Sequence, residues 1–99
     1  MTMHNPPHPG EFIREVYLDP FGLSARNLAT RMQVSPSTVA RLLRGRSAVS
    51  PEMALRLSRA LGRSPESWLA MQDMHDLAAA RSQIDLADIE PLSFDEAAP

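Results

Sequence analysis

Hydrophobic residues along this chain recur every three or four positions, as on the buried face of a helix. The clearest groups are Phe12, Ile13 and Val16; Leu28 and Ala29; Val39, Leu42 and Leu43; and Met53, Leu57, Ala60 and Leu61. No segment alternates apolar and polar residues as a half-buried strand does. We therefore predict an all-α fold with five helices, at about 9–18, 24–32, 36–44, 51–61 and 65 to the low eighties.

Serine-proline pairs mark the starts of three of these helices. Ser35-Pro36, Ser50-Pro51 and Ser64-Pro65 each offer an N-cap hydroxyl followed by proline at the first helical position. Gly45 and Gly62 stand where the preceding helices should end, because glycine adopts the left-handed conformation of a C-terminal cap. The signals for start and stop thus agree with the hydrophobic spacing.

The segment 28–45 has the pattern of a helix-turn-helix. Two short helices joined by a tight turn need a small residue on the first, here Ala29, and an apolar residue in the turn, here Val34. The second helix needs branched or large apolar residues, which Val39 and Leu42 provide. This motif predicts DNA binding through the second helix.

The polar face of that second helix carries groups suited to DNA. Ser37, Arg41 and Arg44 follow the i, i+4, i+7 spacing of one helical face. Hydroxyls at the start of the helix can meet phosphates or base edges, whereas an arginine can bond two acceptors on one guanine. The predicted DNA-binding residues are Ser35, Ser37, Thr38, Arg41, Arg44 and Arg46, the last placed for a phosphate.

The net charge of -2 conceals a basic middle and an acidic end. Residues 24–63 hold eight arginines and one acid, Glu52, whereas residues 85–99 hold five acids and no base. A ligand responds to the local field, so the basic region remains compatible with nucleic acid. The acidic end also contains Ile89, Leu92 and Phe94, which makes it either a free tail, a contact for a basic partner protein, or an arm that crosses to a sister subunit.

Several runs resemble the HigA family of antitoxins, also described as the VapI type, within the Xre and Cro/C1 helix-turn-helix group. They are VSPSTVARLLRGR at 34–46, SPEMALRL at 50–57, ALGRSPESWLAMQ at 60–72 and HPGE at 8–11. Two positions depart from the family: Gln33 occupies a turn position that is often glycine, and His75 stands where tyrosine is common. Either a left-handed turn at Gln33 is mildly strained, or the turn differs slightly from that of the family.

The resemblance implies a lambda-repressor-like domain that forms a homodimer on the inverted-repeat operator of its own operon. Its protein partner would be a HigB-like toxin, a RelE-like enzyme that cleaves mRNA on the ribosome. Two other functions remain open: a helix-turn-helix regulator without a toxin, and an inhibitor that has lost DNA binding. The serines and arginines retained on the polar face of the second helix argue against the last of these.

The chain divides by composition into a flexible N-terminal arm (1–8), the helix-turn-helix domain (9–84) and an acidic C-terminal tail (85–99). The absence of cysteine excludes disulfides and thiolate metal sites. The scattered histidines predict no metal and no cofactor, and no nucleophile accompanies the acids, so we expect no enzymatic activity. No signal peptide or membrane span is recognisable, and we expect a cytoplasmic protein.

Three further expectations concern single residues. Arg56, Arg59 and Arg63 are expected to form a solvated helix face, as charges spaced along a helix usually do. His75 is expected to lie along the fifth helix, and Trp68 to belong to the core.

Overall fold

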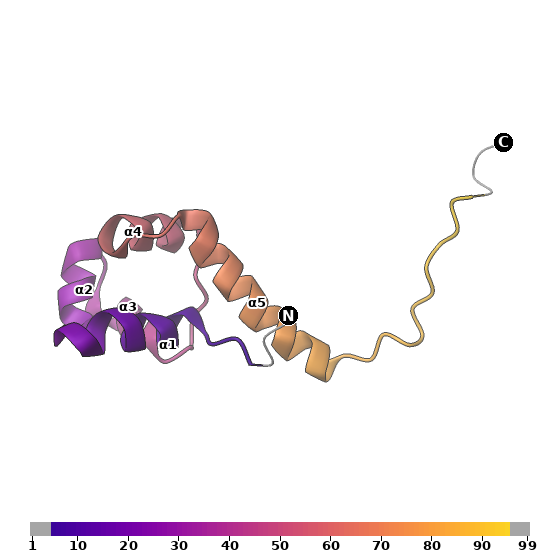
Figure 1. The fold of residues 1–99 in the computed structure, drawn as a ribbon, viewed down its shortest axis with the longest axis horizontal. Coiled ribbons are helices and arrows are strands. Elements are labelled where there is room, and N and C mark those ends of the chain that lie inside the picture. Colours follow the sequence, from indigo (N-terminus) through magenta and orange to yellow (C-terminus); the bar gives the residue numbers. More distant parts are fainter. Residues whose placement is uncertain (1–4, 96–99) are drawn as a thin grey trace.

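The computed structural model describes residues 5–95, and these contain helices and connecting segments but no strand (Figure 1). The elements in chain order are α1 (Pro9–Ile13), η1 (Arg14–Leu18), η2 (Asp19–Phe21), α2 (Ala25–Met32), α3 (Pro36–Leu43), α4 (Pro51–Leu61) and α5 (Pro65–Gln83). The all-α fold and the five predicted helices are confirmed.

The first predicted helix changes its geometry halfway. After α1 the chain widens into the π-helix η1 and then tightens into the 3-10 turn η2. Residues five apart share a face in a π-helix, and Ile13 and Leu18 are indeed both buried. Val16, which the sequence pattern placed on the apolar face, is instead 42% exposed.

Side-chain caps begin the helices α2 to α5, and those at Ser35, Ser50 and Ser64 confirm the prediction. Ser24 and Asn27 form a reciprocal capping box at α2, with N···O distances of 3.1 and 2.8 Å. Ser35, Ser50 and Ser64 each accept a hydrogen bond from the backbone N–H three residues later. Positive φ angles at Gly45 and Gly62 follow the ends of α3 and α4. These caps supply partners for backbone groups that a helix leaves unpaired at its ends.

The core joins all five α-helices and the end of η1. Its buried hydrophobic members are Ile13, Leu18, Leu28, Ala29, Met32, Val39, Leu42, Val49, Ala54, Leu57 and Trp68. Trp68 is fully buried, and its indole N–H donates to the carbonyl oxygen of Gly62 at 2.9 Å. The prediction that Trp68 is a core residue is confirmed, and its one polar group is satisfied.

Gly10 lets α1 lie directly on the end of α3. A Cβ at this position would fall 1.9 Å from the carbonyl oxygen of Leu42, which is far inside van der Waals contact. Only glycine permits this approach of the two backbones. Buried Gln72 of α5 accepts a hydrogen bond from the Val49 N–H at 2.9 Å and so holds the loop before α4.

The C-terminal half of α5 projects beyond the other helices, and residues 84–95 continue away from them without helix or strand (Figure 1). Every residue from Arg81 to Asp95 is exposed. Within the described range, no helix is long and apolar enough to cross a membrane.

Candidate nucleic-acid interface

Helices α2 and α3 form the predicted helix-turn-helix around a shared buried face. Ala29 of α2 and Val39 of α3 have no exposed surface, and Leu42 has almost none. Val34 in the turn is half-buried and packs against the same core. Each apolar position that the motif requires is therefore filled, and α3 has one face fixed inward and the other free.

The turn contains a left-handed residue that is not glycine. Gln33 has φ 59° and ψ 45°, so of the two alternatives left open by the sequence the left-handed turn is the one present. The Gln33 N–H donates to the Thr30 carbonyl at 3.2 Å, and the Val34 N–H donates to the Ala29 carbonyl at 3.1 Å. This pair of bonds is the Schellman arrangement, which satisfies carbonyls at the end of α2 but normally has glycine at the position of Gln33.

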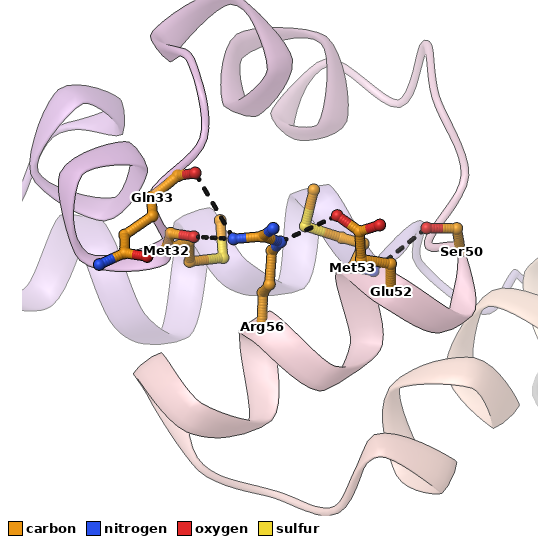
Figure 2. A network of polar contacts seen from close by, with 6 residues as sticks. All are labelled: Met32, Gln33, Ser50, Glu52, Met53 and Arg56. Atoms are coloured by element: carbon orange, nitrogen blue, oxygen red, sulfur yellow. Dashed lines mark hydrogen bonds and ion pairs between the residues drawn. The ribbon is translucent and has the colours of Figure 1, made fainter.

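The guanidinium group of Arg56, on α4, contacts the backbone of this turn (Figure 2). Its Nη1 donates to the Met32 carbonyl at 2.6 Å and lies 3.5 Å from the Gln33 carbonyl, while its Nε donates to Glu52 Oε2 at 3.1 Å. A cation at the C-terminal end of a helix is favoured by the helix dipole. The prediction of a merely solvated side chain was wrong for Arg56, and Glu52 four residues earlier signals only the ion pair within α4 and not the contact with the Met32 carbonyl.

Three hydroxyl groups gather at the start of α3. Ser35 Oγ accepts from the Thr38 N–H at 3.2 Å and lies 3.1 Å from Ser37 Oγ and 2.8 Å from Thr38 Oγ1. Ser35 and Ser37 are exposed and Thr38 is half-buried. The structure thus brings these predicted residues together at a helix N-terminus, where the dipole and free N–H groups favour an anion.

The three predicted arginines lie toward and beyond the other end of α3. Arg41, Arg44 and Arg46 are all exposed, and none of them forms an ion pair with a residue in the range 5–95. The Arg46 N–H closes the helix by donating to the Arg41 carbonyl at 2.9 Å, across the left-handed Gly45. The outward face of α3 therefore combines hydroxyls at its start with unpaired guanidinium groups at its end.

Two histidines join the segment before α1 to α5. His8 caps α1 by accepting the Gly10 N–H on Nδ1 at 2.9 Å, and its ring meets that of His75 edge to face, with centroids 5.2 Å apart. His75 Nδ1 lies 2.9 Å from the Pro6 carbonyl oxygen, which can only accept, so Nδ1 carries the hydrogen. His75 therefore reaches out to the N-terminal segment and does not simply lie along α5 as expected.

Burial, together with the nearby His75, lowers the pKa of His8 from its usual value. The backbone of Ser47 and the carboxylates of Asp76 and Glu11 act in the opposite direction. The neutral form is the one that can accept the Gly10 N–H, so the lowered pKa and the capping role agree.

Residues 5–8 fall within the predicted N-terminal arm, and the rest of that arm, residues 1–4, lies outside the described residues. Within residues 5–8, Pro6 is buried and His8 is half-buried.

The other two arginines that the sequence places on a solvated helix face differ in their surroundings. Arg59 is exposed, and the Arg63 guanidinium lies 5.2 Å from the centre of the Phe12 ring. Within residues 5–95, no three metal-ligating side chains converge on a common point.

Comparison with known proteins finds a helix-turn-helix family model that matches residues 13–68. The chain is 42% identical to the uncharacterized HTH-type transcriptional regulator YddM of Escherichia coli, over 93% of this chain and 97% of that protein. It is 35% identical to antitoxin HigA-1 of Vibrio cholerae, over 83% of this chain and 77% of that protein. A solved structure of antitoxin GraA in complex with its operator matches with a TM-score of 0.83 and 40% identity, over 94% of this chain and 96% of that one.

Proposed function

The chain belongs to the HigA-type antitoxin family of Xre-type helix-turn-helix proteins, and on this basis we propose that it is a dimeric antitoxin that represses its own operon. The observation that carries the proposal is the outward face of α3, whose hydroxyls and unpaired arginines stand on an intact helix-turn-helix framework. The likeness to GraA bound to its operator supports the same reading.

In this function α3 enters the major groove of double-stranded DNA. Arg41 bonds the two major-groove acceptors of a guanine, and Arg44 lies one turn further along the same face. Ser35, Ser37 and Thr38 contact phosphates or base edges at the start of the helix, and Arg46 contacts a phosphate. Arg56 makes no DNA contact and instead holds the turn that sets the angle of α3.

A homodimer on an inverted repeat is the second part of the proposal. One small module buries too little surface for tight specific binding, whereas a two-fold dimer doubles it. The exposed face of α5 supports a self-contact, since Ala70, Met74 and Leu77 follow the i, i+4, i+7 spacing of one helical face. Met74 is 47% and Leu77 50% exposed, so these two side chains offer apolar surface that a second copy would cover.

The third part is neutralisation of a HigB-like toxin of the RelE type, an mRNA-cleaving enzyme. Membership of the HigA-type family supports this partnership. The proposed function consists of binding DNA and protein, without enzymatic activity or a cofactor, and operator binding would take place in the cytoplasm.

Coexpression with the product of the adjacent gene tests the toxin partnership. We expect that gene alone to arrest growth and cleave mRNA on ribosomes, and this chain to restore growth. The Arg41→Ala variant is the matched control, because it should lose repression and keep neutralisation. If the neighbouring product is harmless, or remains toxic beside this chain while the chain still represses its promoter, the protein is a regulator without a toxin.

A further inference from the structure

A groove of about 630 Å³ lies between the end of η1, α2 and the last turn of α4. Its apolar lining residues are Leu18, Leu23, Leu28, Ala60 and Leu61. Two cations, Arg31 and Arg59, line the same groove. Both are exposed, and neither is in the single ion pair found among residues 5–95, which joins Arg56 to Glu52. The groove therefore offers apolar surface beside two positive charges that have no acidic partner among residues 5–95.

The segment from 85 to 95 has the complementary composition. Leu86, Ile89, Leu92 and Phe94 are between 55% and 78% exposed. Asp88 and Glu90 stand between them, Asp85 and Asp95 flank them, and the segment contains no base. A run of exposed apolar side chains interleaved with carboxylates matches an apolar groove with a basic rim.

We propose that the acidic segment 85–95 of one chain docks in this groove of a second copy, and that the segment of the second copy docks in the groove of the first. Leu86, Ile89 and Leu92 cover the apolar lining, and the carboxylates beside them meet Arg31 and Arg59. The exchange is isologous, so the assembly is complete as a dimer and both grooves are occupied.

The reach of the chain keeps Leu86 and Ile89 out of the groove of the same copy. Ala60 and Leu61 of the groove precede the start of α5, whereas the acidic segment leaves from its far end (Figure 1). A helix of 19 residues is about 28 Å long. Leu86 and Ile89 can lie at most about 10 and 20 Å beyond Gln83, at roughly 3.4 Å per extended residue. Neither can return along α5 to its own groove.

A two-fold axis through the exposed face of α5 brings the segment to the other copy. Met74 stands at the middle of α5, and two such helices related by a perpendicular two-fold axis run antiparallel. The end of each α5 then lies beside the beginning of its mate, close to the groove that contains Leu61. This step rests on the proposed homodimer but is independent of toxin binding.

Disulfide trapping tests the docking cleanly, because the chain has no cysteine of its own. Full-length Ile89→Cys protein is mixed with Leu23→Cys protein that carries a mass tag, and the mixture is oxidised mildly. We expect a covalent pair of unlike chains, about tenfold or more above the yield with tagged Ala48→Cys, because docking raises the local concentration of the two thiols. Ala48 is exposed and does not line the groove.

Charge reversal supplies an independent arm. Arg31→Glu with Arg59→Glu in the Leu23→Cys chain should reduce the trapped pair severalfold, and Asp88→Arg with Glu90→Arg in the Ile89→Cys chain should restore it. A yield no higher than that of the Ala48→Cys control overturns the inference. It is also overturned if a chain ending at Ile84 keeps full dimer affinity and loses only its hold on the toxin.

Sedimentation of the unmodified chain separates the two possible failures. A dimer whose thiols fail to pair contradicts the docking alone. A chain that is monomeric both without DNA and when bound to DNA contradicts the homodimer and the docking together.

Discussion

Arg56 Nη1 lies 2.6 Å from the carbonyl oxygen of Met32, so a side chain of α4 caps the helix that precedes the turn of the helix-turn-helix (Figure 2). The next residue, Gln33, is left-handed without being glycine. The turn that orients α3 is thus held by a contact from outside the motif, and this offsets the unfavourable backbone conformation at Gln33.

Arg56→Gln should lower the free energy of unfolding by about 1–2 kcal/mol, because it removes charged hydrogen bonds to two helix-end carbonyls. Urea denaturation measures the change. Arg44→Gln is the control: that arginine is exposed and forms no ion pair within residues 5–95, and its loss should change stability by no more than about 0.5 kcal/mol. Equal effects of the two substitutions would show that Arg56 does not support the turn.

Gly10→Ala should destabilise the fold by about 3 kcal/mol or more, since the new Cβ overlaps the backbone of Leu42 and must push α1 away from α3. Gly22→Ala provides the comparison. It meets open space but has φ +63°, so it should cost only about 1 kcal/mol of conformational strain. Thermal unfolding of both variants checks the order, and a mild effect at Gly10 would contradict the close approach of the two helices.

Acidification should weaken the fold through His8. Its pKa is lowered in the folded protein, so the stabilisation is fully present above the ordinary pKa of 6.5 and is lost as the pH falls from there through the folded-state pKa. His8→Asn keeps an N-cap acceptor that does not titrate. The variant should lose less stability than the original chain between pH 7.5 and 5.5 in urea titrations. Parallel losses would mean that His8 does not contribute to the pH dependence.

Arg41→Ala should cost roughly 1–3 kcal/mol of operator affinity and relax the base preference at one position. Arg46→Ala should weaken binding to all sequences alike and reduce the salt slope by about one phosphate contact. Competition of specific against random DNA at several salt concentrations separates the two. Identical behaviour on both kinds of DNA would remove the distinction between a base-reading and a phosphate-binding arginine.

Much of the fold could be predicted because local signals coincide with the hydrophobic spacing. The serine caps, the prolines after them and Gly45 fix the limits of α3 to within a residue. The π-helix after Ile13 could not be predicted, since it depends on how Leu18 reaches the core rather than on any local preference. Val16 was misplaced for this reason.

The candidate DNA face was accessible to sequence reasoning because its residues lie within one short helix. The contacts of Arg56 with Met32 and of His75 with Pro6 join residues far apart in the chain. Periodicity shows which side of a helix faces inward but not which distant carbonyl a long side chain reaches. The roles of Ser35, Ser37, Thr38, Arg41, Arg44 and Arg46 in DNA binding remain predictions.

Titration of a labelled DNA fragment from upstream of the chain's own operon tests the central claim most directly. We expect two chains per inverted repeat, half-sites about one helical turn apart, and an affinity at least about a thousandfold above that for random DNA at the same salt concentration. Binding of a single chain to a single half-site, or equal affinity for the operator and for random DNA, would contradict it.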